Sequence, residues 1–257
     1  EWGMDNEATK QLCLNLMRAD SEAEVVRLLA DASFWDDQDA WRYYGDRQTN
    51  YNAGGNQQDN PAAALVEKLI NSVDARLNGE CLARGLDPTG PEAPETMQQA
   101  VARFFDPGVN PDRGTAGRLE EWTAAKRTEV ARGITLAATG AGVRSGNPCF
   151  TIADSGEGQT PEAMPTTLLS LDRDNKFRIA FVQGKFNMGG MGALKFCGEQ
   201  RLQLVVTRRD WQILNRQGRS HKSDDQWGFT VVRRETPTDC LCQSKTGSPA
   251  FSVMLLT

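Results

Sequence analysis

Histidine is almost absent from this 257-residue chain, which contains one, His221, and long apolar runs are missing altogether. A lone histidine makes a zinc site unexpected, and it excludes a Ser-His-Asp or Cys-His triad unless His221 itself serves. No apolar segment approaches the roughly 20 residues of a membrane-spanning helix, and no secretory signal is visible near the first residues. We therefore expect a cytoplasmic protein without a membrane partner.

The chain also lacks an excess of positive charge, because 34 acidic residues outnumber 29 basic ones and the formal net charge is −5. This balance does not indicate a polyanion-binding surface, although nucleic acid stays open as a partner. Two local basic pairs, Arg208-Arg209 and Arg233-Arg234, are interpreted as solvated ends of strands.

Cysteines are scattered, and several lie in apolar contexts. Reduced thiols fit this distribution better than a disulfide framework does. The six are Cys13, Cys81, Cys149, Cys197, Cys240 and Cys242.

The length and the hydrophobic content of 39% allow one large domain or one domain with an extension. We expect a helical N-terminal extension over residues 1–59, in which Ser21 and Glu24 form a capping box. The main domain is expected over residues 60–257. Its stretch 79–146, rich in glycine, proline and charge, is interpreted as an insertion on the rim with helical pieces.

Strand patterns concentrate in the second half of the chain. "CFTIAD" (149–154) is typical of a short buried strand ending on an aspartate, and alternation predicts three further strands in "RLQLVVTRR", "WGFTVVRRE" and "AFSVMLLT". Because helices precede strands without regular alternation, the fold class predicted is α+β, with helices on one face of a mixed, mostly antiparallel sheet.

A polar stripe runs along the predicted helix "NPAAALVEKLINSVDARL". Asn60 is its N-cap and Pro61 its first residue. The spacing of four, three and four predicts one buried face, formed by Val66, Ile70, Val73 and Leu77. Glu67, Asn71 and Asp74 follow the same rhythm one residue later, so three oxygen-bearing side chains line the edge of that face.

Two glycine-containing motifs follow. In "TIADSGEGQT", Asp154 ends a strand and precedes Gly156 and Gly158, which allows a ligand to approach the backbone or simply makes a turn. In "QGKFNMGGMGAL", glycines precede a helix-like segment and present backbone N–H groups to anions such as phosphate, or form a loop without a ligand. Neither standard nucleotide-binding fingerprint is present.

Taken in this order, the three motifs resemble those of the GHKL ATPase superfamily, which includes gyrase B subunits, large heat-shock chaperones, sensor histidine kinases, MutL proteins and MORC ATPases. The resemblance covers about residues 60–235 and implies a two-layer α/β sandwich, the Bergerat fold, that binds ATP with Mg²⁺. It implies that Glu67 is the catalytic general base that orients or deprotonates water, that Asn71 holds the metal, and that Asp74 supports the site beside it.

The resemblance further implies that Asp154 binds the adenine amino group and that Gly156 and Gly158 belong to the adenine pocket. Thr230 is a weaker-matching candidate that assists adenine binding through water. Backbone amides of a lid would wrap the phosphates, which maps onto Gly184, Gly189, Gly190 and Gly192.

Two positions depart from the family pattern. Asn187 stands at the first inner glycine of the lid, where its tolerance of positive φ preserves the turn. Lys185 is a further phosphate contact or a surface lysine. The stretch from Asn71 to Asp154 is long for the family, which supports the insertion.

The expected function is ATP hydrolysis with lid closure that drives dimerisation or partner engagement, in a setting such as bacterial antiviral defence or DNA maintenance. Two alternatives stay open. One is an ATP-binding regulatory or scaffold module without turnover. The other is a histidine-kinase-type catalytic domain, for which His221 is poorly placed.

Overall fold

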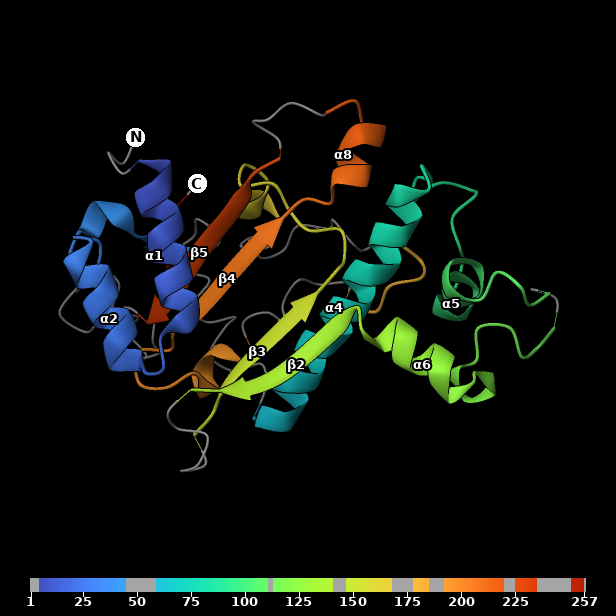
Figure 1. The fold of residues 1–257 in the computed structure, drawn as a ribbon, viewed down its shortest axis with the longest axis horizontal. Coiled ribbons are helices and arrows are strands. Elements are labelled where there is room, and N and C mark those ends of the chain that lie inside the picture. The colour runs from blue at the N-terminus through green and yellow to red at the C-terminus, as the bar shows by residue number, and fades with distance from the viewer. Residues whose placement is uncertain are drawn as a thin grey trace.

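The computed structural model describes residues 5–44, 59–110, 113–140, 147–167, 178–184, 192–219, 225–234 and 251–256, which form an α+β arrangement (Figure 1). The larger sheet has the strand order β1-β6-β5-β4, and a separate hairpin pairs β2 with β3. Every described strand pair is antiparallel. The strands are β1 (Arg42–Tyr43), β2 (Ile134–Thr139), β3 (Cys149–Asp154), β4 (Gln203–Arg208), β5 (Trp227–Arg234) and β6 (Phe251–Leu256).

The four strands predicted from sequence are confirmed, with one correction to their environment. Strand β3 does end on Asp154, but most of its side chains are exposed rather than buried. Its partner β2 lies within the predicted insertion, where its Thr and Ala content gave little strand signal. Leu136 and Phe150, which lie on one face of this hairpin, are exposed.

Two N-terminal helices, α1 (Asn6–Arg18) and α2 (Glu22–Asp31), are followed by the 3₁₀ turn η1 (Gln38–Ala40). The predicted capping box is confirmed in part: the Glu24 amide donates to Ser21 Oγ at 3.2 Å, but Glu24 Oε2 accepts from the amide of Asp20, at 2.9 Å, and not from that of the N-cap residue Ser21. Together these bonds satisfy donors that would be left without partners at the start of α2.

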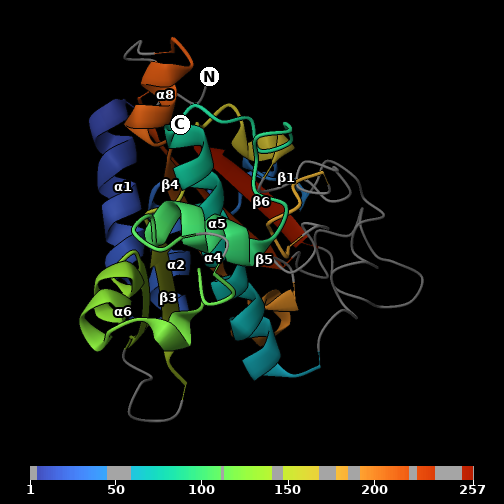
Figure 2. The same ribbon diagram turned by 90° about the vertical axis from the view of Figure 1, so that its right-hand side faces the viewer.

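These helices share a hydrophobic core with the larger sheet. Leu12, Leu16 and Leu29 pack with Phe229 and Val231 of β5. Alternate residues of β4 contribute to the same core, so α1 and α2 cover one face of the sheet (Figure 2).

Helix α4 (Pro61–Ala83) packs on the β2–β3 hairpin and reaches the opposite face of the larger sheet, where Lys68 Nζ donates to Gln203 Oε1 of β4 at 3.2 Å. Helices therefore lie on both faces of the sheet, and the prediction of helices on one face is wrong in this respect. The N-terminal segment supplies enough apolar surface to bury the face that α4 leaves uncovered.

The N-terminus of α4 is confirmed, since Asn60 Oδ1 accepts from the amides of Ala62 and Ala63. Its predicted buried face is partly wrong. Leu77 is buried and Val73 packs beside it, whereas Val66 is 52% exposed. Small residues of α4, among them Ala75 and Gly79, contact the turn after β3 instead.

The remaining helices lie around α4. Helix α5 (Met97–Phe105) packs on it through Phe104, in a core that Phe181 also joins, and α8 (Trp211–Arg216) contacts its C-terminal part. Helix α6 (Ala124–Ala131) and three 3₁₀ turns complete the description: η4 (Leu119–Glu121), η6 (Met164–Thr166) and η7 (Leu194–Phe196). None of the helices in the described ranges has the length and hydropathy required to cross a bilayer.

The two basic pairs are not simply solvated strand ends. Arg233 is buried between the rings of Trp35 and Trp41, with its guanidinium carbon 4.7 and 3.8 Å from their centroids. Arg209 is also largely buried, with 15% of its side chain exposed. Arg208 alone of these three lies at the surface, paired with Asp225.

Candidate functional site

The polar stripe predicted from sequence lies on α4 as expected. Glu67 and Asn71 are half-buried, and Asp74 is completely buried. The rhythm extends one step further, to Asn78, which is also buried. At about 100° per residue these four side chains project from one side of α4.

Asp74 fixes the start of the glycine-rich segment, residues 184–192. Its Oδ1 accepts from the amide of Gln183 at 3.0 Å, and its Oδ2 accepts from the amide of Gly184 at 2.7 Å. A carboxylate that accepts two backbone N–H groups away from water forms strong, charge-assisted hydrogen bonds. The aspartate therefore ties α4 to a segment 109 positions later in the sequence.

Gly184 also lies directly against Asn71. A Cβ atom on residue 184 would approach Asn71 Oδ1 to 2.7 Å and Asp74 Oδ2 to 3.1 Å, so only glycine leaves both oxygens undisturbed. Asn71, Asp74 and Gly184 are thus brought together. Gly192 is buried just before η7. The candidates outside the described residues are Lys185, Asn187, Gly189 and Gly190.

Asp154 approaches the same helix from the end of β3. Its Oδ2 accepts from Ser72 Oγ at 2.8 Å, and its Oδ1 accepts from the Gly156 amide at 3.0 Å. The residue remains exposed, and an ionised carboxylate has further lone pairs available. Ser72 follows Asn71 directly in α4, so two neighbouring helix residues serve the two halves of the candidate site.

The glycines after Asp154 are packed against protein. Gly156 lies on Ala75, where a Cβ would come within 2.6 Å of the alanine Cβ. Gly158 has a φ of +60°, and a Cβ there would lie 1.7 Å from the carbonyl oxygen of Arg208. Both glycines are therefore required for the turn to fit between α4 and β4. Close packing of the turn therefore accounts for both glycines.

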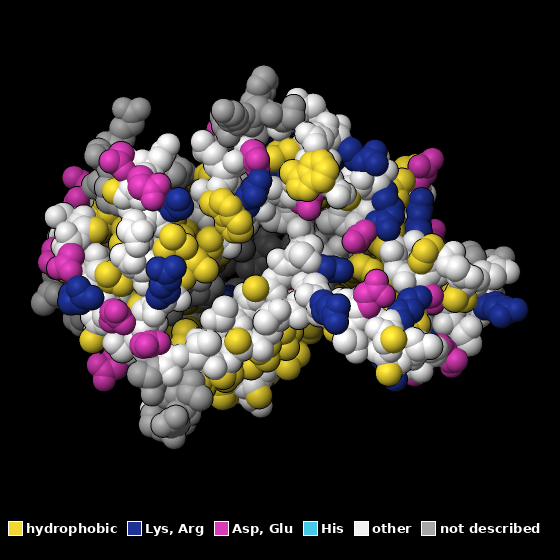
Figure 3. Space-filling view, in the orientation of Figure 1, with side chains coloured by type: hydrophobic (Ala, Val, Ile, Leu, Met, Phe, Trp, Pro, Cys, Tyr) yellow, Lys and Arg dark blue, Asp and Glu magenta, His cyan; other side chains and the backbone are white. Residues whose placement is uncertain are grey.

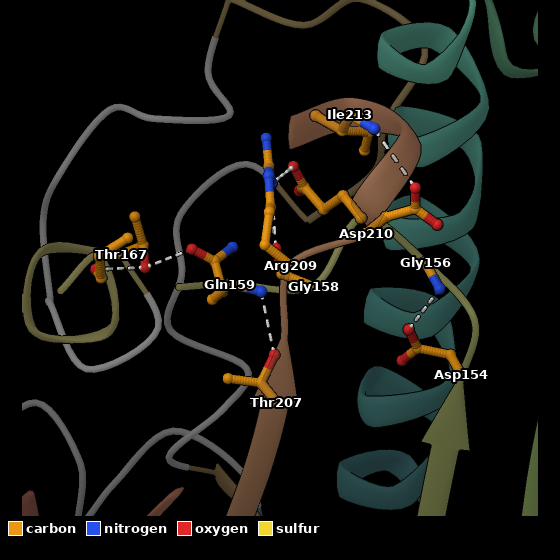
Figure 4. A network of polar contacts seen from close by, with 11 residues as sticks. Asp154, Gly156, Gly158, Gln159, Thr167, Thr207, Arg209, Asp210 and Ile213 are labelled. Carbon is orange, nitrogen blue, oxygen red and sulfur yellow. Dashed lines mark hydrogen bonds and ion pairs between the residues drawn. The ribbon is translucent and has the colours of Figure 1, made fainter. Parts of the chain in front are cut away.

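A polar network holds this turn in place (Figure 4). Arg209 Nη1 donates to Glu157 Oε2 at 2.8 Å and to the Gly158 carbonyl at 3.0 Å. The Gln159 amide donates to Thr207 Oγ1 at 3.0 Å. The turn is consequently attached to β4 through both side chains and main chain.

Thr230 lies in the middle of β5, opposite Val205 of β4, and is completely buried. Paired residues point to the same face of a sheet, and Val205 shares its face with Gln203, which contacts Lys68 of α4. Thr230 therefore lies on the α4 side of the sheet, the side that carries the candidate residues.

Four residues at this site were not predicted from the sequence: Ser72, Lys68, Arg209 and Asn78. Ser72 was hidden by the expectation that the helix edge carried only the Glu67, Asn71 and Asp74 stripe. Lys68 was not considered, yet burial lowers the pKa of its ammonium group to about 8, while electrostatic interactions with Cys197 and Glu67 oppose the shift. Arg209 was interpreted as solvated. The i+4 step from Asp74 to Asn78 was the signal available for a fourth residue of the stripe.

The surface is hollowed between β4 and β3, on the face seen in Figure 1 (Figure 3). The two strands point in the same direction there but belong to different sheets. A separate shallow pocket is lined by residues 88–91 and 93–95 with Arg178 and Ala180, and none of the candidate residues lines it.

The donors at the site suit a hard cation better than zinc. Asn71 offers an amide oxygen and Glu67 a carboxylate, and oxygen ligands are those that Mg²⁺ prefers. Within the described ranges, no cluster of three or more His, Cys, Asp and Glu side chains forms a ready metal cage. A metal bound here would need most of its ligands from water or from a second ligand such as phosphate.

Comparisons of the chain with protein families, with curated proteins and with solved structures found no match.

Proposed function

We propose that this chain binds ATP with Mg²⁺ and hydrolyses it, as the GHKL resemblance implies. The observation that carries the proposal is that both glycine-containing motifs, distant in sequence, contact the helix that bears the polar stripe, α4. Asn71 and Asp74 meet Gly184, while Ser72 of the same turn holds Asp154. A helix that served only packing would have no need to contact both other motifs through polar atoms.

The base would bind at Asp154. The helix and the turn orient its carboxylate through one bond to each oxygen, and its exposed lone pairs can accept from the exocyclic amine of adenine. Thr230, on the same side of the sheet, is the proposed second contact, through water. The fold observed is α+β. That its layers form a Bergerat sandwich is part of this proposal.

The phosphates would lie towards the other end of the stripe. Asn71 would hold Mg²⁺, which neutralises phosphate charge when bound. Glu67 lies one helical turn before Asn71 on the same side of α4, where it would orient the attacking water and accept its proton. Wrapping of the phosphates by residues 184–192, and lid closure linked to dimerisation or partner binding, rest on the resemblance alone.

Phosphate release from Mg-ATP tests the proposal. We expect Glu67→Ala to reduce the rate by at least about a hundredfold, the usual contribution of a general base. Glu80→Ala is a matched control, because Glu80 lies on the same helix but pairs with Arg84 at the surface. Equal rates in the wild type and Glu67→Ala would refute the catalytic assignment.

Calorimetry distinguishes the alternative without turnover. Mg-ATP binding by the wild type without phosphate release would favour a regulatory or scaffold module. Transfer of phosphate to the protein, instead of to water, would favour the histidine-kinase type. Its acceptor would be His221, which lies outside the described residues.

A further inference from the structure

One arginine side chain makes two of the polar contacts that hold the turn after Asp154. Arg209 directly follows β4 and donates both to the carboxylate of Glu157 and to the carbonyl of Gly158 (Figure 4). Its side chain is 15% exposed and that of Glu157 is 12% exposed. One guanidinium group therefore donates hydrogen bonds both to a side chain and to the main chain of the turn.

Glu157 joins three parts of the fold through its backbone. Its amide donates to the carbonyl of Ala75 in α4 at 3.1 Å, and its carbonyl accepts from the amide of Asp210 at 3.0 Å. Asp210 is in turn the N-cap of α8. The residue between the two glycines is thus fixed to α4 on one side and to the β4–α8 junction on the other.

We propose that Arg209 and Glu157 are a positioning pair that sets the place of Asp154 against α4 and thereby the affinity for the nucleobase. This inference rests on the proposed function. Both charges are largely removed from water, so loss of the arginine leaves a buried carboxylate without compensation. The turn must then shift to solvate Glu157, and Asp154, three residues earlier, shifts with it.

The effect is confined to binding because the pair is remote from the proposed general base. Glu67 precedes Ala75 by eight residues, about 12 Å along the helix. Moving the turn therefore weakens binding of the nucleobase equally in the ground state and in the transition state. Such a loss raises KM and leaves kcat unchanged.

Arg208 provides a matched control. It is the preceding residue and also forms an ion pair, with Asp225 at 2.6 Å, but 37% of its side chain is exposed. Exposed pairs contribute little to stability. Arg208→Gln and Arg209→Gln therefore remove the same group from neighbouring positions and differ in whether the Asp154 turn loses a contact.

Steady-state phosphate release with Mg-ATP tests the pair. We expect Arg209→Gln to raise KM about tenfold, the equivalent of about one lost hydrogen bond to the nucleobase, with kcat near that of the wild type. Arg208→Gln should match the wild type in both constants. An equal KM change in the two variants, or a fall in kcat with KM unchanged, overturns the proposal. Arg209→Lys keeps the positive charge but lacks the planar guanidinium group with its several N–H donors. Its KM should therefore lie between those of the wild type and Arg209→Gln.

Hydrogen exchange without nucleotide separates the pair from the proposed function. Amides of residues 155–160 should exchange faster in Arg209→Gln than in Arg208→Gln, and equal exchange overturns the positioning role. A wild type that neither binds nor hydrolyses ATP refutes the proposed function while this readout still decides the pair. If Arg209→Gln does not fold, Arg209→Lys and Glu157→Gln replace it, and unchanged KM and exchange in both overturn the proposal.

Discussion

Asp74→Asn is the substitution that most directly tests how α4 is joined to the glycine-rich segment. The change keeps the size of the side chain and replaces one acceptor oxygen by an NH₂ donor. In the wild type the two oxygens accept from two different backbone amides, at 3.0 Å from Gln183 and 2.7 Å from Gly184. The Gln183 amide also lies 3.2 Å from Oδ2, so an asparagine oxygen in the Oδ2 position can keep the Gly184 bond and a longer Gln183 bond, while its NH₂ then faces the Gln183 amide in place of Oδ1.

The expected loss in the free energy of unfolding follows from the burial of the Asp74 side chain. The Asp74 side chain is completely buried, so water cannot replace the missing acceptor. Loss of one hydrogen bond to a charged group, together with the contact between two N–H donors that replaces it, costs about 2 to 4 kcal/mol. That is a large part of the 5 to 15 kcal/mol that stabilises an ordinary domain.

Urea unfolding measures this loss. Asp5→Asn is the matched control, because Asp5 caps α1 by accepting from the Ala8 amide at 2.7 Å but lies at the surface. Asparagine is as good an N-cap as aspartate, so the control should lose less than about 0.5 kcal/mol. A loss for Asp74→Asn as small as that of Asp5→Asn, with an unchanged m value, would refute the reasoning.

Three further predictions concern neighbouring positions of the same helix and segment. Gly184→Ala should weaken Mg-ATP binding in calorimetry by at least about tenfold, because its methyl group displaces the Asn71 oxygen. Asn78→Leu should raise the urea midpoint of the nucleotide-free protein, since within the described residues Asn78 Oδ1 is buried without a hydrogen-bond partner; a lower midpoint would contradict this. Burial lowers the pKa of Lys68 from 10.5 to about 8, so the unfolded chain binds more protons between these values and stability contributed at this site rises with pH. Lys68→Met should remove that rise, which amounts to at most about 3 kcal/mol, and urea unfolding of both proteins at pH 7 and pH 10 measures it.

Local signals were enough to predict several elements. These signals each depend on residues within or next to one element. They are the N-cap and first-turn proline of α4, the N-cap of α2, and the alternation in β4 and β5. The α+β class follows from their order along the chain. These features were confirmed because local backbone preferences and tertiary packing agree at those positions.

Features that depend on partners distant in sequence were not predictable. Val66 has the spacing of a core residue, but it is exposed in the structure. The α4 residues that contact the turn after β3 are small ones, such as Ala75 and Gly79. Arg233 has the sequence context of a solvated strand end, yet the N-terminal segment places Trp35 and Trp41 around it. Burial of a charged group depends on what packs over it, which periodicity within one strand cannot show.

The residues of the candidate site also divide into those predicted from sequence motifs and those identified only by contacts across the fold. Sequence identified Asn71, Asp74, Asp154 and Gly184 as candidates, and the structure brings the first two to Gly184 and places Asp154 on the neighbouring Ser72. Ser72 and Arg209 carry no motif of their own and became visible only through the contacts that they make across the fold.

Calorimetric titration of Mg-ATP into the wild type and Asp154→Asn is the most direct test of the central claim. Asparagine can still accept from the Gly156 amide and donate its NH₂ to Ser72 Oγ, which keeps the turn, but it removes the carboxylate oxygens that would accept from adenine. We predict binding by the wild type and an affinity at least about tenfold weaker in Asp154→Asn. No binding by the wild type, or equal affinity in both proteins, would contradict the account.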